Sequence, residues 1–205
     1  MALSARRRVA RLASAAFGLA LAITPFAAPD AHAQGAWLDQ PTPTSWNSVG
    51  MAVPSAPSDA YANPRCALDE RPAETAEDLA LTAAGWRLFR EYESGWSLRV
   101  ILGLAGYDGM CRPTGFQVFV FLGGTFAGTL SPTPMDSRAD GSLTESRFLS
   151  PLPGENTLSA TFNRYTDLDP LCCPSGRATV TYLMERGAAG PVLVPVRAET
   201  GPTGP

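Results

Sequence analysis

From Trp86 onward, apolar side chains recur mostly at every second residue, which is the pattern of β-strands. The apolar run Phe116–Leu122 predicts a central strand that is covered on both faces. Gly123-Gly124 predicts a two-residue hairpin turn into the next strand. The predicted strands cover residues 86–92, 97–104, 116–122, 125–130, 144–149, 157–165, 178–185 and 192–197.

A single helix is predicted before the strands, over residues 74–85. Thr75 and Asp78 have the spacing of a capping box, and Gly85 suits the position just after the last turn. One helix followed by hairpin-linked strands predicts an α+β fold with one N-terminal helix and a mostly antiparallel β-sheet, stapled by disulfides.

The N-terminal segment has the organisation of a secretory signal peptide, predicted to cover residues 1–33. A basic stretch is followed by mostly apolar residues 12–28 and by the A-x-A site Ala31-His32-Ala33. Cleavage is predicted between Ala33 and Gln34, so we expect a secreted, periplasmic or cell-envelope protein. The pattern leaves the general secretory and twin-arginine routes both open.

Three further segments are predicted in the exported chain. Residues 34–64 are rich in Pro, Ser and Ala and predict a flexible or extended arm, with Trp37 and Trp46 expected to dock on the domain. Residues 65–197 are predicted to form a single α+β domain, and 198–205 a flexible tail. After the leader no stretch has the ~20 apolar residues of a membrane span, and we expect a monomer.

The composition of the exported chain excludes several kinds of chemistry. Cleavage removes His32, the only histidine, and the chain contains no lysine. A Ser-His-Asp triad and lysine-dependent mechanisms are therefore ruled out. The exported part keeps 12 of the 16 arginines and 18 of the 19 acidic residues, which argues against nucleic acid and anionic membrane surfaces as partners. No cofactor is expected.

Four cysteines remain after cleavage, at positions 66, 111, 172 and 173. An even number of cysteines in an oxidising compartment predicts disulfides, and three pairings are possible. We favour the two crossed pairings, which join Cys66 and Cys111 separately to Cys172 and Cys173, because a bridge between adjacent residues is strained. A zinc site is disfavoured because it needs two spaced cysteine pairs.

Three loops contain the candidate binding residues. Asp108 and Arg112 lie in the turn-like segment 106–113, and Asp167 and Asp169 lie in the proline-restricted segment 167–175. The connection 131–143 contains the third group. Its candidate residues are Asp136, Arg138 and Asp140.

The segment 136–147 partly matches a calcium-binding loop. Asp136, Asp140, Gly141 and Leu143 match loop positions 1, 5, 6 and 8. Arg138 and Arg147 occupy positions 3 and 12, where the loop needs oxygen ligands. We therefore expect a turn that Asp136 and Asp140 stabilise locally, and ion binding is left open.

These features favour an exported, non-catalytic domain that binds a protein or an envelope glycan, or supports the envelope. One alternative is a carboxylate-based hydrolase of an envelope glycan, which needs only two facing carboxyl groups. The candidate acids for that reaction are Asp108, Asp136, Asp140, Glu145, Asp167 and Asp169. A second alternative is a secreted inhibitor that presents the stapled loop 170–176 to a protease.

Three stretches of the chain resemble one family. GYDGMCRPTGFQVFVFLGGTFAGTLSP at 106–132, MDSRADG at 135–141 and NRYTDLDPLCCPS at 163–175 are similar to bacterial envelope proteins of the LppP/LprE type. The resemblance spans roughly residues 65–196. It implies an exported envelope protein and carries over no catalytic residue. Family members are lipoproteins, whereas this sequence has no lipobox cysteine, so the resemblance does not imply membrane anchoring here.

Overall fold

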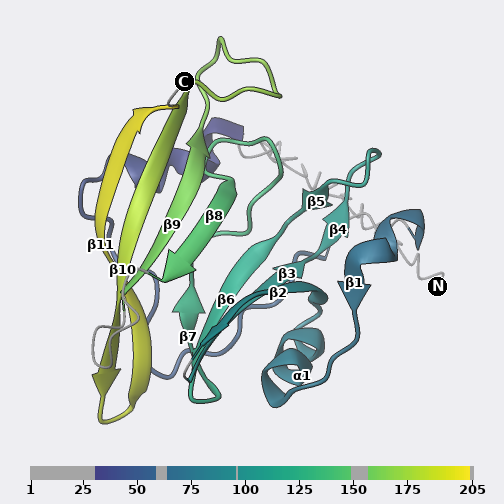
Figure 1. Ribbon diagram of the computed structural model, residues 1–205, viewed down its shortest axis with the longest axis vertical. Helices are drawn as coiled ribbons and strands as arrows, with labels where there is room; N and C mark the ends of the chain where they lie inside the picture. The colour runs from purple at the N-terminus through teal and green to yellow at the C-terminus, as the bar shows by residue number, and fades with distance from the viewer. Residues whose placement is uncertain (1–30, 59–63, 96, 149–156, 204–205) are drawn as a thin grey trace, which may run out of the picture.

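The computed structural model of the protein describes residues 31–58, 64–95, 97–148 and 157–203 (Figure 1). All strand pairs in these residues are antiparallel. One sheet has the order β1-β2-β3-β6-β7, with β1 (Glu70–Arg71), β2 (Arg87–Gly95), β3 (Leu98–Leu104), β6 (Gln117–Leu122) and β7 (Thr125–Thr129). The other has the order β11-β10-β9-β8, with β8 (Leu143–Phe148), β9 (Thr157–Arg164), β10 (Gly176–Gly187) and β11 (Gly190–Pro202). A short hairpin joins β4 (Gly106–Tyr107) and β5 (Pro113–Thr114).

Strand β6 lies between two hydrophobic layers, which confirms the prediction for the apolar run. Val118 and Val120 lie in the core that the two sheets share, together with Phe162 and Val180 of the second sheet. The alternate residues of β6 face a second core, which the helix α1 (Ala76–Ala83) covers. Its buried members are Leu81, Trp86, Leu88, Ile101, Ala105, Phe119, Phe121 and Phe126. Over the described residues the fold is therefore mostly antiparallel β-sheet with one α-helix, consistent with the α+β prediction.

The predicted turn and cap are present. Gly123 and Gly124 both have positive φ, at 58° and 79°, as a tight hairpin between β6 and β7 requires. Thr75 and Asp78 form the reciprocal capping box at the start of α1. The helix ends at Ala83, two residues before the predicted limit, and Gly85 follows with φ of 90°.

The N-terminal arm is docked, with Trp37 and Trp46 packed on the domain as the sequence analysis expected. It begins in the 3-10 helix η1 (Ala31–Asp39), and the ring of Trp37 packs edge-on against Trp46 and Phe162, with centroids 4.9 and 5.1 Å apart. Asn47 is buried and bonds both sheets, through Thr129 of β7 and Leu193 of β11. The free energy gained by burying these large side chains offsets the conformational entropy that the arm loses when it docks.

The last strand, β11, continues to Pro202, five residues beyond the predicted strand end at 197. Its last residues pair with β10 in an unbroken register from Gly176↔Pro202 to Thr181↔Arg197. The NH of Thr203 then donates to the carbonyl of Ser175 at 3.0 Å. Hydrogen bonds between the backbones of β10 and β11 therefore hold the last residues in a strand, although their side chains do not alternate between apolar and polar.

The cysteines pair as Cys66–Cys111 and Cys172–Cys173, which corrects the predicted crossed pairing. The 3-10 helix η2 (Pro64–Asp69) carries Cys66 beside the β4–β5 hairpin that carries Cys111. The other two cysteines lie in the loop between β9 and β10, at a different end of the molecule (Figure 1). The topology, which the cysteine spacing does not reveal, therefore separates the two pairs.

The predicted signal peptide lies outside the described residues, except for its last three positions in η1. Within the described residues, no helix has the length and apolar character needed to cross a bilayer.

Candidate functional site

The connection between β7 and β8, residues 130–142, joins several parts of the chain through carboxylates. Asp136 accepts a hydrogen bond from the NH of Gly115 at 2.7 Å and another from Nε2 of Gln34 at 3.2 Å. Arg138 has φ of 64° and an exposed side chain, and the preceding Ser137 donates from its hydroxyl to the carbonyl of Pro113. Both donors to Asp136 lie outside the connection, so this carboxylate joins distant segments instead of stabilising its own turn as predicted.

Asp140 links the connection to the end of β9. Its side chain is only 5% exposed, and Oδ1 accepts hydrogen bonds from Nε of Arg164 and from the NH of Tyr165, both at 2.9 Å. The arm closes over this carboxylate at Gly35, where an added Cβ would lie 1.9 Å from Oδ2 of Asp140. A glycine is therefore required for the close approach of η1.

Arg164 is bound by two carboxylates. Its Nη2 donates to Oδ1 of Asp39 in η1 at 2.8 Å, while its Nε donates to the buried Asp140. Burial by itself lowers the pKa of Arg164, but the hydrogen bonds to Asp39 and Asp140 outweigh it and raise the pKa. This one cation therefore connects the arm, the 130–142 connection and the second sheet.

The loop between β9 and β10, residues 165–175, is braced from inside by Asp169. One oxygen of this carboxylate, Oδ2, accepts from the NH of Thr166 at 2.8 Å and from the NH and hydroxyl of Ser175 at 3.0 and 2.8 Å. The backbone bonds from Thr166 and Ser175 lower the pKa of Asp169 to about 2. Both ends of the loop are thereby held by one carboxylate.

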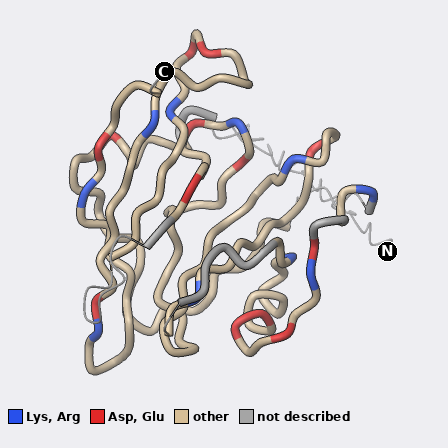
Figure 2. Tube along the Cα trace, in the orientation of Figure 1, with Lys and Arg blue, Asp and Glu red and all other residues tan. Residues whose placement is uncertain are grey.

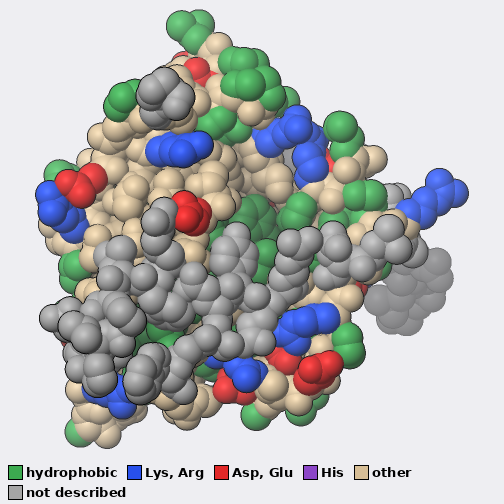
Figure 3. All heavy atoms as spheres, viewed as in Figure 1, with side chains coloured by type: hydrophobic (Ala, Val, Ile, Leu, Met, Phe, Trp, Pro, Cys, Tyr) green, Lys and Arg blue, Asp and Glu red, His purple; other side chains and the backbone are tan. Residues whose placement is uncertain are grey.

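The apex of the same loop is exposed. Asp167 lies on its surface, and Leu168 and Leu171 are 93% and 67% exposed, beside the bonded pair Cys172–Cys173. Figure 1 shows the loop projecting beyond the ends of the strands. Figure 3 shows hydrophobic side chains gathered at that end of the molecule. Exposed leucines on a braced loop are typical of a contact surface.

A surface pocket of about 460 Å³ lies beside this loop. Four segments form its wall: the arm, the end of β9, the start of β10 and the last part of β11. The lining residues are Leu38, Asp39, Pro41, Arg164, Tyr165, Thr166, Ser175, Gly176, Ala198 and Thr200. The volume falls within the range of small-molecule sites, roughly 300–1,000 Å³.

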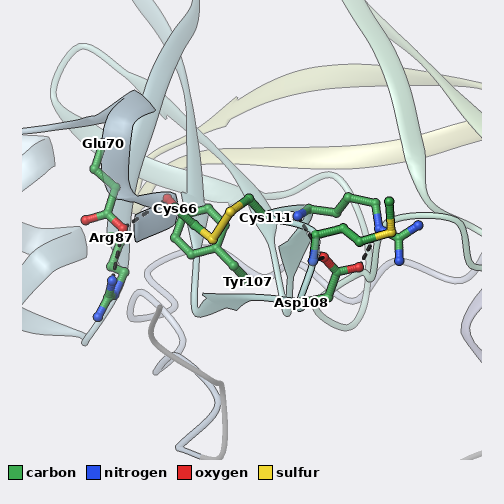
Figure 4. Close-up of a disulfide and its surroundings, with 8 residues drawn as sticks. Cys66, Glu70, Arg87, Tyr107, Asp108 and Cys111 are labelled. Atoms are coloured by element: carbon green, nitrogen blue, oxygen red, sulfur yellow. Dashed lines mark hydrogen bonds and ion pairs between the residues drawn. A yellow bond between two sulfur atoms is a disulfide. The ribbon is translucent and has the colours of Figure 1, made fainter. Parts of the chain in front are cut away.

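The remaining predicted loop, residues 106–113, contributes none of the residues that line this pocket. Figure 4 shows it beside the Cys66–Cys111 disulfide. Asp108 accepts from the NH groups of Met110 and Arg112 and forms an ion pair with the Arg112 guanidinium. Burial raises the pKa of Asp108, but the bonds from Arg112 and Met110 outweigh it, so the pKa is lowered. Arg112 is thus neutralised within its own loop.

Glu70 organises the base of the same loop. It accepts from Nη1 of Arg87 at 2.9 Å and from the hydroxyl of the buried Tyr107 at 3.0 Å, next to Cys66–Cys111 (Figure 4). Covalent and polar contacts together fix this loop to η2, which indicates a structural role.

The structure brings together some of the predicted site residues and separates others. Asp140 and Asp169 both act at the ends of the 165–175 loop, whereas Asp108 and Arg112 lie elsewhere. The pocket wall contains one carboxylate, Asp39, which is not among the six acids predicted for a hydrolase. In the part of the chain that the structure describes, no group of three or more His, Cys, Asp or Glu residues could hold a metal ion.

Sequence reasoning missed Arg164, Asp39 and Thr200. Arg164 lies in the NRYTDLDPLCCPS stretch, at the end of a predicted strand and just before a loop that contains two aspartates. A basic residue at such a position is a signal that could have identified Arg164 as a site residue. Asp39 and Thr200 lie 125 and 36 residues away from it, in segments predicted to be flexible. Their proximity depends on tertiary structure alone.

Acidic and basic residues both occur along the described chain, and the start of α1 is acidic. Figure 2 shows the positions of acidic and basic residues over the loops and strand ends, and acidic residues on α1.

No curated protein and no solved structure gives a significant match to this chain. Residues 90–186, which run from β2 into β10, match the family model described as LppP/LprE lipoprotein. The match covers the 130–142 connection, Arg164 and the 165–175 loop, and it confirms the predicted resemblance: over these residues the protein is LppP/LprE-like.

Proposed function

We propose that this protein is an exported, non-catalytic binding domain of the cell envelope. The observation that carries the proposal is the use of the loop carboxylates. Asp140 and Asp169 hold the 165–175 loop in place through protein donors, and the loop in turn presents Leu168 and Leu171 to solvent. A rigid loop loses little entropy when a partner binds, which is the property expected of a recognition element.

Two further observations support this proposal over the hydrolase. Asp108 and Asp136 also accept hydrogen bonds from backbone NH groups, so these carboxylates already serve to hold their own loops in place. The family match points to an envelope lipoprotein, and the predicted signal peptide would direct the chain to that compartment.

Cell fractionation with mass spectrometry tests the export. Cells expressing the full chain are separated into cytoplasm, envelope and medium, and the N-terminal peptide is identified. We expect the chain in the envelope or medium, beginning at Gln34. Accumulation in the cytoplasm with residues 1–33 attached would contradict the proposal.

Cosedimentation with washed, insoluble envelope material tests the binding. The processed protein is mixed with this material, and the bound fraction is compared with that of the same protein after reduction and alkylation under denaturing conditions. Binding that is saturable and confined to the folded protein is expected. Equal sedimentation of both forms would show that the association is non-specific.

The exposed loop also favours a second function, inhibition of a protease by the 165–175 segment. The test is inhibition of a panel of envelope or secreted proteases by the processed protein. Leu168→Gln should then weaken inhibition at least tenfold, whereas Leu79→Gln, which changes an exposed leucine on α1, should leave it unchanged. Cleavage of the loop without inhibition would argue against this function.

A further inference from the structure

The pocket beside the 165–175 loop has a guanidinium whose charge is already balanced. Arg164 lines the wall with 17% of its side chain exposed, and it is bonded to Asp39 at the mouth and to Asp140 behind it. Two carboxylates and one guanidinium leave the site slightly negative. An anionic ligand would have to compete with Asp39 for Arg164, so the charges favour a neutral ligand.

Three residues with hydroxyl groups line the same pocket. Thr166 and Ser175 line it from the two ends of the 165–175 loop, and Thr200 lines it from β11. Asp169 fixes the backbone of Thr166 and Ser175 on opposite sides of the loop, with hydrogen bonds of 2.8 and 3.0 Å. The polar part of the pocket is thus set before any ligand arrives, which lowers the cost of binding.

The arm supplies an apolar part of the wall. Leu38 and Pro41 lie there beside Ala198 of β11, and the NH of Ala198 donates to the carbonyl of Pro41 at 2.8 Å. This bond covers part of the free edge of β11, the outer strand of its sheet. The pocket therefore combines apolar surface with paired donors and acceptors.

We propose that this pocket binds a neutral oligosaccharide. Sugar hydroxyls both donate and accept hydrogen bonds. They can accept from the exposed part of Arg164, donate to the carboxylate of Asp39, and do either with the threonine and serine hydroxyls. The C–H faces of a sugar ring match the exposed apolar surface of Pro41 in the pocket wall. This inference rests on the proposed envelope function and specifies the ligand class.

Titration calorimetry or ligand-observed NMR with defined oligosaccharides tests the inference. The processed full-length protein is titrated with chitotriose, mannotriose and maltotriose as neutral probes and with trigalacturonate as an acidic one. At least one neutral probe should bind with a Kd of about 1 mM or lower, and trigalacturonate at least tenfold more weakly. No neutral binding up to about 10 mM, or preferential binding of the acidic probe, would overturn the inference.

A matched pair of variants locates the binding. Thr200→Tyr places a bulky side chain in the pocket, and Glu199→Tyr places the same side chain at the neighbouring exposed position of β11, which points to the other face. Thr200→Tyr should weaken binding at least tenfold and Glu199→Tyr less than twofold, with thermal unfolding of both variants within a few degrees of wild type. Equal affinity of the two variants would exclude this pocket.

The same variants separate this inference from the proposed function. If the folded protein sediments with envelope material and Thr200→Tyr sediments equally well, the envelope function stands and the pocket is not its glycan site. If the wild-type protein binds neither envelope nor oligosaccharide, both proposals fail.

Discussion

Nε of Arg164 donates a hydrogen bond of 2.9 Å to Oδ1 of Asp140, which joins the end of β9 to the connection that follows β7. The carboxylate is almost fully buried, and the guanidinium continues outward to Asp39 in the arm. Through this pair, residues far apart in sequence form one structural unit beside the pocket and the 165–175 loop.

The substitution Asp140→Asn is expected to destabilise the protein by about 2–3 kcal/mol, because it leaves the half-buried Arg164 with one carboxylate instead of two. The control is Glu199→Gln, which breaks the exposed pair with Arg197 and should cost less than about 0.5 kcal/mol. Urea unfolding followed by tryptophan fluorescence measures both changes. Equal stabilities of the two variants would show that the Asp140 pair contributes no more than a surface contact.

Asp78 should make the stability depend on pH in the acidic range. The hydrogen bond from Arg71 and those from the backbone lower the pKa of Asp78 from 3.8 to about 2, against the opposing effect of burial. Since the folded-state pKa is the lower one, this stabilisation is present above pH 4 and is lost as the pH falls through 2. It amounts to about 2 kcal/mol.

The measurement for Asp78 is the free energy of unfolding of wild type and Asp78→Asn between pH 5 and pH 2. Wild type should be the more stable at pH 5, and the difference should shrink toward pH 2. A difference that stays constant over this range would mean that ionisation of Asp78 does not contribute.

Asn47→Ala should cost about 2–3 kcal/mol. The amide of Asn47 donates to the carbonyls of Thr129 and Leu193, at 3.0 and 2.9 Å, and accepts from the NH of Thr129 at 2.9 Å. Its removal leaves buried groups without these partners on both sheets. The control is Ser48→Ala, at the exposed neighbouring position. Chemical unfolding compares the two, and similar stabilities would contradict a bridging role for Asn47.

Gly128→Ala should also destabilise the protein, by more than about 2 kcal/mol. Gly128 has φ of 143°, and an added Cβ would lie 2.3 Å from Cγ of Asn47. Gly109→Ala is the control, because an added Cβ meets nothing within 4 Å there. Since Gly128 and Asn47 are in contact, the double variant should be less destabilised than the sum of the single changes. Strict additivity would indicate that backbone strain alone causes the loss.

Peptide mapping decides the cysteine pairing. Trypsin cleaves after Arg164 and Arg177, so Cys172 and Cys173 fall in one peptide, 165–177. The pairing in the structure predicts this peptide as a free species, lighter by two hydrogen atoms than its reduced form, and a separate cross-link between the peptides with Cys66 and Cys111. Under non-reducing conditions, crossed pairing would instead join all three peptides.

Much of the local structure could be predicted from the sequence. The capping box of Thr75 and Asp78, the Gly123-Gly124 hairpin and the two-sided burial of β6 depend on neighbouring residues and on periodicity. The contacts made by the docked arm and the full length of β11 could not be predicted in this way. Their order comes from partners such as Phe162, Thr129 and Ser175, far from them in sequence.

The sequence by itself determined the antiparallel strands, the single helix and the family resemblance, because hydrophobic period, capping and turn chemistry are local properties. Only the tertiary structure decided that Cys66 pairs with Cys111 and that Arg164 lies between Asp39 and Asp140. Those contacts join residues that only the arrangement of the two sheets brings within bonding distance, and no local pattern encodes that arrangement.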